Sequence, residues 1–274
     1  MSRGDLWRTR AVRFAASSER RRNPLAGAFA APARAWLRRG AVRVPAGAAA
    51  GLRLSLEHLP VTHAHAAGIA SGWVEHEVQE AMRRHLAGGG VVYDVGANIG
   101  FFALLAARLV GPAGHVYAVE PVAENADAVR ANAELNDFEN VTVVERAAGA
   151  TTGREPLLVV ADASWSHLAA RGSHPQTART VEVEVVALDE LVAAGEIAPP
   201  TFVKIDVEGS EADVLNGMRE SLRQHRPIIV CELHDTNAEV ADALEELGYE
   251  VTSLEGPQPL REAPPDVHVI ARPR

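Results

Sequence analysis

Residues 91–100 decide the fold, and they read Val91-Val92-Tyr93-Asp94-Val95-Gly96-Ala97-Asn98-Ile99-Gly100. The apolar run predicts a buried strand, and the glycines after it predict a tight turn into a helix. A second apolar run over 115–119 ends in Glu120, twenty residues past Gly100. An acidic side chain at the tip of a second strand is suited to bind a ribose diol. Together the turn and Glu120 predict an adenosine-containing cofactor.

Strands and helices alternate on both sides of this turn. The pattern predicts helices at 74–86, 99–110, 122–135, 210–224 and 237–247, and strands at 91–95, 115–120, 141–145, 202–207 and 228–233. Such alternation indicates an α/β fold, a parallel sheet with helices on both faces. Strand patterns at 157–160 and 181–185 predict an extended or hairpin insertion. Two more, at 249–254 and 267–271, predict a final antiparallel hairpin.

Two helix starts carry capping signals. Ser210 with Asp213, and Thr236 with Glu239, each place a hydroxyl three residues before a carboxylate. This is the spacing of a capping box, in which the hydroxyl accepts a hydrogen bond from the first turn of the helix. We therefore expect both hydroxyls to cap their own helices.

Composition indicates a globular protein with an uneven distribution of charge. The chain has 274 residues, 47% of them hydrophobic, and a formal net charge of −9. Its first 43 residues hold eleven Arg against Asp5 and Glu19, so the remainder is strongly acidic. An acidic body argues against a nucleic-acid partner, because phosphate contacts need clustered Lys and Arg. We expect a basic extension over 1–70, in the form of a helical cap or an arm, and one main domain over 71–274.

The single cysteine and the hydropathy pattern bear on location. Cys231 lies in the apolar run 227–231, and we expect it to be a buried core residue and not a nucleophile. One cysteine excludes a disulfide framework within the chain. The sequence also contains no run of about 20 apolar residues that could span a bilayer. These features predict a cytoplasmic protein with a small-molecule substrate and no membrane span, and they are compatible with a homodimer.

The glycine spacing separates two classes of cofactor. A dinucleotide-binding turn has three glycines spaced G-x-G-x-x-G, which fit a pyrophosphate to the helix N-terminus. This chain has only Gly96 and Gly100, with Asn98 between them. Asp94 could face an ammonium group, whereas it would repel a phosphate. S-adenosylmethionine carries an amino group and an adenosine, so it fits Asp94 and Glu120 better than a nicotinamide dinucleotide does.

The predicted contacts with this cofactor follow the ends of three strands. The predicted cofactor-binding residues are Asp94, Gly96, Asn98, Gly100, Glu120, Glu145, Arg146 and Ala147. The first four are expected around the methionine part, Glu120 on the ribose, and the last three near adenine. Tight strand-to-helix packing is the alternative explanation for the two glycines, and a solvated strand end is the alternative for Glu120.

Five short motifs have a recognisable combination. They are Asp94 to Gly100, Glu120-Pro121, Leu188-Asp189-Glu190-Leu191, Lys204-Ile205-Asp206-Val207-Glu208-Gly209-Ser210-Glu211, and Arg226-Pro227 before Glu232. This set resembles the FkbM family of S-adenosylmethionine-dependent methyltransferases over roughly residues 72–233. The resemblance implies a class I Rossmann-like methyltransferase fold, with a mostly parallel seven-stranded sheet whose last strand is antiparallel. It also implies methyl transfer, usually to a hydroxyl oxygen of a sugar, polyketide or similar natural product.

The stretch 204–209 follows the fourth core strand, and ligands of open α/β sheets bind beyond such strand ends. Lys204, Asp206 and Glu208 share one face of the strand, because side chains alternate. A purely structural Lys–carboxylate pair is the alternative interpretation.

The predicted catalytic residues are Asp206, Glu208 and His234. Asp206 is expected to hold cofactor or substrate, while an acid or His234 takes the hydroxyl proton. His167 is a second candidate base, in a polar excursion whose Ser164, Trp165 and Ser166 could wall the substrate pocket.

A metal ion is the competing device for activating a hydroxyl. Asp206, Glu232, His234 and Asp235 would converge from two adjacent strand ends, and oxygen-rich ligand sets suit Mg²⁺. The same acids could simply bind sugar hydroxyls, so a metal is not favoured.

Three other functions stay open: N-methyl transfer to an amino sugar or amide, a non-catalytic cofactor-binding protein of this fold, and a nicotinamide-dependent oxidoreductase. The missing third glycine disfavours the last of these.

Overall fold

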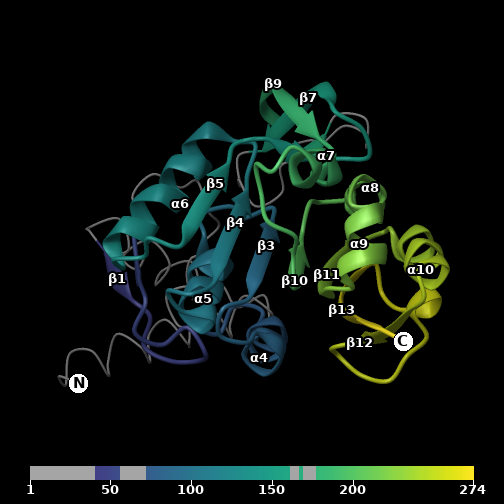
Figure 1. The fold of residues 1–274 in the computed structure, drawn as a ribbon, viewed down its shortest axis with the longest axis horizontal. Helices are drawn as coiled ribbons and strands as arrows, with labels where there is room; N and C mark the ends of the chain where they lie inside the picture. Colours follow the sequence, from purple (N-terminus) through teal and green to yellow (C-terminus); the bar gives the residue numbers. More distant parts are fainter. Residues whose placement is uncertain (1–40, 56–71, 161–166, 169–176) are drawn as a thin grey trace, which may run out of the picture.

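A computed structural model describes residues 41–55, 72–160, 167–168 and 177–274. Its main sheet has seven strands (Figure 1): in spatial order they are β12 (Tyr249–Ser253), β13 (Asp266–Pro273), β11 (Ile228–His234), β10 (Phe202–Ile205), β3 (Val91–Val95), β4 (His115–Val119) and β5 (Val141–Val144). From β11 to β5 all neighbours pair in parallel. Strand β13 is antiparallel to both of its neighbours. The predicted fold class, including the antiparallel last strand, is confirmed.

Helices cover both faces of this sheet. They are α4 (His76–His85), α5 (Phe101–Val110), α6 (Ala123–Leu135), α7 (Leu188–Ala193), α8 (Glu211–Gly217), α9 (Arg219–His225) and α10 (Asn237–Glu246), with the 3-10 turn η3 at Leu260–Glu262. The helix predicted at 210–224 is two helices, and the break follows Gly217, where a side chain would collide with the backbone of Gly149. No helix in the described ranges has the length and hydropathy to cross a membrane.

Alternate residues of the central strands enter two separate cores, because side chains of a strand point to opposite faces. On β10, Phe202 packs in the core beneath α4, α5 and α6, whereas Val203 and Ile205 pack in the core beneath α7 to α10. Cys231 is fully buried in the second core, and burial raises the pKa of its thiol well above the ordinary value. The prediction of a buried core cysteine is confirmed.

A short hairpin of β1 (Val42–Arg43) and β2 (Arg53–Leu54) belongs to the first core. Its buried side chains are Val42, Val44, Ala49, Leu52 and Leu54. The backbone N–H of Arg53 donates to Asn136 Oδ1 at 2.8 Å, and that of Ser55 to Asn132 Oδ1 at 2.7 Å. Residues 41–55, which the sequence assigned to the extension, therefore pack into the main domain. The expected helical cap or arm over 1–40 and 56–70 lies outside the described residues.

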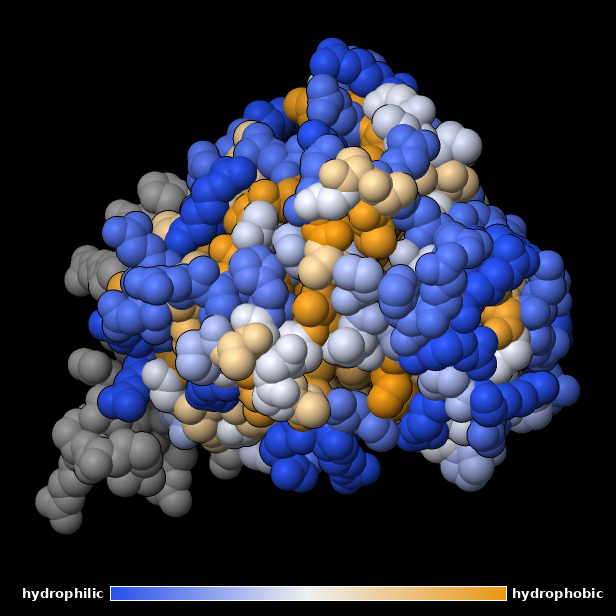
Figure 2. Space-filling view, viewed as in Figure 1, coloured by the Kyte–Doolittle hydropathy of each residue, from blue (hydrophilic) through white to orange (hydrophobic). Residues whose placement is uncertain are grey.

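The predicted insertion is a second, smaller sheet in the order β6-β9-β7-β8. Its strands are β6 (Ala147–Ala148), β7 (Gly153–Val160), β8 (His167–Leu168) and β9 (Thr177–Val186), and β7 and β9 pair antiparallel along most of their length. In Figure 1 this hairpin projects at the top of the view, above the main sheet. Figure 2 shows apolar residues gathered near the centre of the same face, below the hairpin and between hydrophilic surroundings.

Ser210 and Thr236 occupy the N-cap positions of α8 and α10, but neither hydroxyl bonds to its own helix. Thr236 Oγ1 donates to Glu211 Oε2 at 2.7 Å, and Ser210 Oγ is buried with no hydrogen-bond partner. The prediction that these hydroxyls cap their helices is wrong. Donation to the buried carboxylate of Glu211 holds the Thr236 hydroxyl in an orientation that makes no bond to the first turn of α10.

Candidate active site

A cavity of about 200 Å³ opens at the carboxyl ends of β3, β4 and β10. This is the edge at which open α/β sheets bind ligands. The predicted site residues that line it are Gly96, Asn98, Glu120, Ala147, Asp206, Glu208 and Glu232. Leu157 and Leu168 of the small sheet line it as well. The structure therefore brings most of the predicted cofactor and catalytic residues to one cavity.

The turn from β3 into α5 is shaped by packing. Gly96 has a φ of 83°, and a side chain there would put Cβ 1.8 Å from the carbonyl oxygen of Asp206. Gly100 has a φ of 88°, and its Cβ would lie 3.1 Å from Val129 of α6. Only Gly96 lines the cavity. Backbone conformation and close packing require glycine at both positions. Contact of either glycine with a cofactor stays a prediction.

Glu120 is a buried carboxylate, 5% exposed, on the cavity wall. Its Oε2 accepts from Asn98 N at 2.8 Å, and its Oε1 accepts from Val122 N at 3.0 Å and from Asn125 Nδ2 at 3.2 Å. Burial raises the pKa of Glu120 to about 7 in spite of these bonds. Asn98 Oδ1, also buried, has no hydrogen-bond partner. Three hydrogen bonds therefore fix the buried Glu120 carboxylate, and Glu120 is not a solvated strand end.

Lys204 lines the cavity and lies between two carboxylates. The register of β10 on β3 sets it opposite Asp94, and its Nζ is 3.0 Å from Asp206 Oδ2 and 3.9 Å from Asp94 Oδ1. Burial raises the pKa of Asp94 to about 6, although Lys204 opposes the shift. Burial works against the charge of Lys204, but Asp206 and Asp94 outweigh it and raise its pKa. Asp94 does not line the cavity. It pairs instead with the buried Lys204, and a structural Lys–carboxylate pair is the alternative that the sequence left open.

The three residues predicted near adenine separate in the structure. Ala147 lines the cavity. Glu145 is 2.7 Å from Arg130, and Arg146 forms ion pairs with Glu184 at 3.5 Å and Glu196 at 3.3 Å. Neither Glu145 nor Arg146 lines the cavity, because surface partners hold their side chains.

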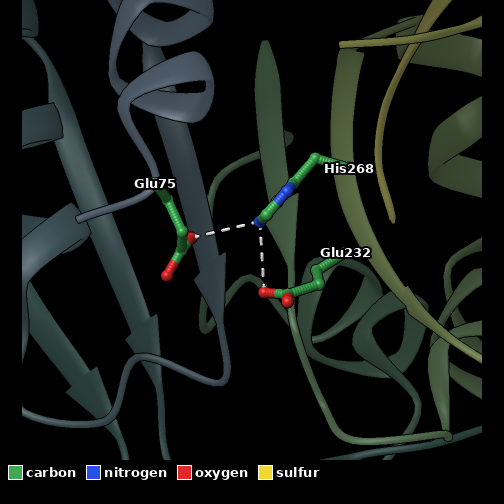
Figure 3. A group of neighbouring side chains, drawn as sticks. All are labelled: Glu75, Glu232 and His268. Atoms are coloured by element: carbon green, nitrogen blue, oxygen red, sulfur yellow. Dashed lines mark ion pairs between the residues drawn. The ribbon is translucent and has the colours of Figure 1, made fainter. Parts of the chain in front are cut away.

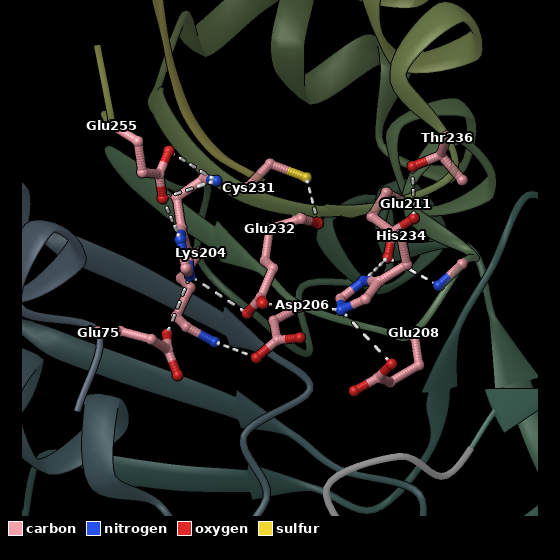
Figure 4. A network of polar contacts seen from close by, with 12 residues as sticks. Glu75, Lys204, Asp206, Glu208, Glu211, Cys231, Glu232, His234, Thr236 and Glu255 are labelled. Carbon is pink, nitrogen blue, oxygen red and sulfur yellow. Dashed lines mark hydrogen bonds and ion pairs between the residues drawn. The ribbon is translucent and has the colours of Figure 1, made fainter. Parts of the chain in front are cut away.

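His234 is held from both sides (Figure 4). Its Nδ1 lies 2.9 Å from Glu211 Oε1, and its Nε2 lies 3.4 Å from Glu208 Oε2 and 3.8 Å from Glu232 Oε1. Burial would lower the pKa of His234, but the Glu211 hydrogen bond and the Glu208 charge outweigh it and raise the pKa to about 9. The surrounding carboxylates therefore favour the charged form of the imidazole, and His234 does not line the cavity. A role of His234 as the base stays a prediction.

Sequence reasoning missed three residues of this network. Glu211, 0% exposed, stood in a quoted motif without a role; it also accepts from Gly209 N at 2.8 Å. His268 is the cross-strand partner of Glu232, and its Nε2 lies 3.3 Å from Glu232 Oε2 and 3.6 Å from Glu75 Oε2 (Figure 3). Burial would lower the pKa of His268, but Glu232 and Glu75 raise it to about 11. No local spacing connects Glu75 with His268.

The proposed metal ligands meet only in part. Ligand atoms of Asp206, Glu232 and His234 lie within 4.8 Å of one another, and so do those of Glu75, Glu232 and His268. Asp235 is exposed, in a turn with a φ of 59°, and belongs to neither group. The backbone of His167 pairs with Leu158, while Ser164, Trp165 and Ser166 lie outside the described residues.

Known proteins are similar to this chain over more than half of its length. Residues 94–251 match the family model described as Methyltransferase FkbM domain. The chain is 34% identical over 147 residues to the hexuronic acid methyltransferase AglP of Haloferax volcanii, covering 53% of this chain and 56% of that one. It is 29% identical over 198 residues to the 31-O-demethyl-FK506 methyltransferase FkbM of Streptomyces tacrolimicus, covering 62% and 76%. A crystal structure of methyltransferase FkbM from Methylobacillus flagellatus KT aligns with a TM-score of 0.46 at 20% identity, covering 66% and 43%.

Proposed function

The chain belongs to the FkbM family of methyltransferases, and we propose that it transfers a methyl group from S-adenosylmethionine to a hydroxyl oxygen of a small natural product such as a sugar or polyketide. The chain spans just over half the length of the hexuronic acid methyltransferase that it resembles, so activity and substrate are argued from the cavity. When bound, this cofactor supplies a methyl group on a sulfonium cation, and an oxygen nucleophile displaces the sulfur.

The charge of the cavity wall carries the proposal. The lining carboxylates are Glu75, Glu120, Asp206, Glu208 and Glu232. Among the described lining residues Lys204 is the single Lys or Arg, and Asp206 already pairs with it at 3.0 Å. Such a wall attracts a sulfonium or ammonium cation and repels a pyrophosphate. It therefore supports S-adenosylmethionine over a nicotinamide dinucleotide.

The β3–α5 turn offers groups that fit the rest of the cofactor. Asn98 Oδ1 is a buried acceptor without a partner, so it can accept from a donor on the ligand. Glu120 Oε2 accepts one backbone hydrogen bond, from Asn98 N, and a carboxylate oxygen can accept a second. Both groups line the cavity. We propose that Glu120 accepts from the ribose hydroxyls, with Asn98 near the methionine part.

Glu208 is the proposed base. It lines the cavity, whereas His234 lies behind it and is already bonded to Glu211. As the bond between the acceptor oxygen and the methyl carbon forms and the carbon–sulfur bond breaks, Glu208 takes the hydroxyl proton. General bases of this kind contribute about 10² to 10⁴ in rate. Burial raises the pKa of Glu208 to about 8, and the neighbouring His234, 3.4 Å away, opposes that shift. A pKa near the working pH suits a general base.

The test is turnover of the purified chain with S-adenosylmethionine and a panel of neutral sugars, uronic acids and polyketide alcohols, followed by mass spectrometry of the product. We expect an added methyl on oxygen, and a fall in kcat of about 10² to 10⁴ in Glu208→Gln with little change in KM for the cofactor. The exposed Glu250→Gln is the matched control. Methylation of amines alone would favour N-methyl transfer, and cofactor binding without turnover would favour a non-catalytic protein.

We also propose a cytoplasmic location, which the single buried cysteine supports because it forms no disulfide. Cell fractionation would test the location. The homodimer and the lack of a nucleic-acid partner stay predictions, for light scattering and for binding assays with RNA.

A further inference from the structure

We propose that Asp206, Glu232 and His234 bind a divalent transition-metal ion, with Mn²⁺ as the test ion, at the acceptor side of the cavity. The ion would polarise the acceptor hydroxyl, and this catalytic role rests on the proposed function. Binding of the ion to the protein does not depend on that function. The three side chains come from the end of β10 and from β11, and their ligand atoms lie within 4.8 Å of one another.

The spacing of His234 and Glu232 suits a shared ion better than a direct bond. Nε2 and Oε1 are 3.8 Å apart, which is too long for a hydrogen bond. Ligands at about 2.0–2.2 Å from one metal ion stand roughly 3 to 4 Å from each other. The distances therefore leave room for an ion between these groups.

Each carboxylate has one oxygen engaged elsewhere. Asp206 Oδ2 is 3.0 Å from Lys204 Nζ, and Glu232 Oε2 is 3.3 Å from His268 Nε2. Figure 4 shows the Asp206 carboxylate between Lys204 and the His234 ring, with Glu232 beside it. The second oxygen of each can then serve as a ligand while the first stays paired. Lys204 thus orients Asp206 in this arrangement.

Glu211 supplies the support that a metal-binding histidine needs. A ligating imidazole usually donates its other ring N–H to a carboxylate, which fixes the ring and selects the ligating nitrogen. Glu211 is fully buried, and its Oε1 lies 2.9 Å from His234 Nδ1. Two further hydrogen bonds, from Gly209 N and Thr236 Oγ1, hold the carboxylate in place. Nε2 is therefore the nitrogen left for a ligand.

Ser210 gives an independent indication that this cavity binds a ligand. Its hydroxyl is 2% exposed, lines the same cavity as Asp206, Glu208 and Glu232, and has no hydrogen-bond partner. A buried hydroxyl without a partner is costly, and bound water or a ligand usually satisfies it. A water molecule on the ion, or the acceptor hydroxyl that the ion holds, would supply the partner.

The second group, Glu75, Glu232 and His268, is the less suitable site. Its histidine Nε2 already lies 3.3 and 3.6 Å from the two carboxylates (Figure 3). Its Nδ1 is 2.7 Å from Glu255. His268 therefore stands where an ion would stand, and it does not line the cavity. The choice of metal follows from the mixed ligand set, because the imidazole favours a transition metal over Mg²⁺ and carboxylate oxygens suit Mn²⁺ among the transition metals.

The experiment is titration of Mn²⁺ into the chelator-treated full chain, followed by the electron paramagnetic resonance signal of free Mn²⁺ and by calorimetry. We expect one site in the wild type, with Mg²⁺ at least about tenfold weaker. His234→Gln should weaken Mn²⁺ binding by more than about tenfold, and His268→Gln should leave it within a few-fold. Asp206→Asn should also lose binding, but it removes a partner of buried Lys204, so His234→Gln decides.

Thermal unfolding shows whether each variant is folded, so that a loss of Mn²⁺ binding can be distinguished from a loss of the fold. Mn²⁺ should raise the Tm of the wild type and of His268→Gln, and leave that of His234→Gln unchanged. Absence of binding to the folded wild type overturns the proposal, and so does loss of binding in His268→Gln with retention in His234→Gln. Equally tight Mg²⁺ overturns the transition-metal assignment. S-adenosylhomocysteine titrated into the same preparation separates the outcomes: if it binds while Mn²⁺ does not, only the metal site fails.

Discussion

Two sides of the same cavity are held by different kinds of interaction. On the cofactor side, the β3–α5 turn and Glu120, backbone N–H groups of Asn98 and Val122 bond to a single carboxylate at 2.8 and 3.0 Å. On the acidic side, which consists of Asp206, Glu208, Glu232 and His234, side chains bond to other side chains, as Lys204 does to Asp206 at 3.0 Å. The first arrangement follows from the path of the chain. The second depends on the charge of every member.

Lys204→Met should give the largest loss of stability, about 3–5 kcal/mol, because Asp94 and Asp206 would stay buried without their cation. Urea unfolding measures the loss. Arg154→Met is the control: it breaks an ion pair with Glu184 whose side chains are 72% and 52% exposed, and should cost less than about 1 kcal/mol. Equal losses would show that charge does not hold the acidic side.

Gly96→Ala tests the cofactor side, where backbone geometry should dominate. We expect a loss of roughly 3 kcal/mol, from the left-handed φ and from a collision with the carbonyl of Asp206. Gly195→Ala is the matched control, since its φ of 73° is also positive but no atom lies within 4 Å of its Cβ. It should cost about 1 kcal/mol in the same urea unfolding. Similar losses in both variants would refute the packing role of Gly96.

Glu120 should make stability depend on pH, because burial raises its folded pKa to about 7 from an ordinary 4.5. The folded state holds this proton more tightly than the unfolded state. The contribution of the Glu120 carboxyl to the free energy of unfolding is therefore present below pH 4.5. It is lost as the pH rises from 4.5 to 7, by at most roughly 3 kcal/mol. Glu120→Gln lacks this titration, so its free energy of unfolding minus that of the wild type should grow over that range.

Glu124→Gln is the control for that pH series, measured by urea unfolding at each pH. The hydrogen bond from Arg179 lowers the pKa of Glu124, so its contribution is present above the ordinary pKa and lost as the pH falls. The difference between Glu124→Gln and wild type should therefore not grow from pH 4.5 to 7. A Glu120→Gln difference that stays flat would mean that Glu120 is not desolvated.

The smallest expected effect concerns two buried serines. Ser210→Ala should stabilise the ligand-free protein by up to about 1 kcal/mol, because it removes a hydroxyl without a partner. Ser221→Ala should destabilise it by about 1–2 kcal/mol, because Ser221 Oγ donates to Asp189 Oδ1 at 2.5 Å. Thermal unfolding of both variants is the measurement. Equal destabilisation would mean that Ser210 has a partner within the protein.

The same contrast explains what could be predicted from the sequence. Gly96, Asn98 and Glu120 were found because a strand, a turn and a second strand tip fix their positions through local pattern. Glu75 and His268 could not be found that way: one precedes α4 and the other lies on β13, and only the register of β13 on β11 sets His268 opposite Glu232. The capping prediction at Thr236 failed for a related reason, since the buried carboxylate of Glu211 accepts its hydroxyl.

Calorimetric titration of S-adenosylhomocysteine into the folded full chain tests the central claim, that the β3–α5 turn and Glu120 hold this cofactor. We predict saturable binding to the wild type, a loss of more than about tenfold in Glu120→Ala, and no change in Glu124→Ala, whose side chain is 57% exposed on the neighbouring helix. Thermal unfolding would confirm that each variant is folded. No heat with the folded wild type, or equal affinity in Glu120→Ala, would contradict the account.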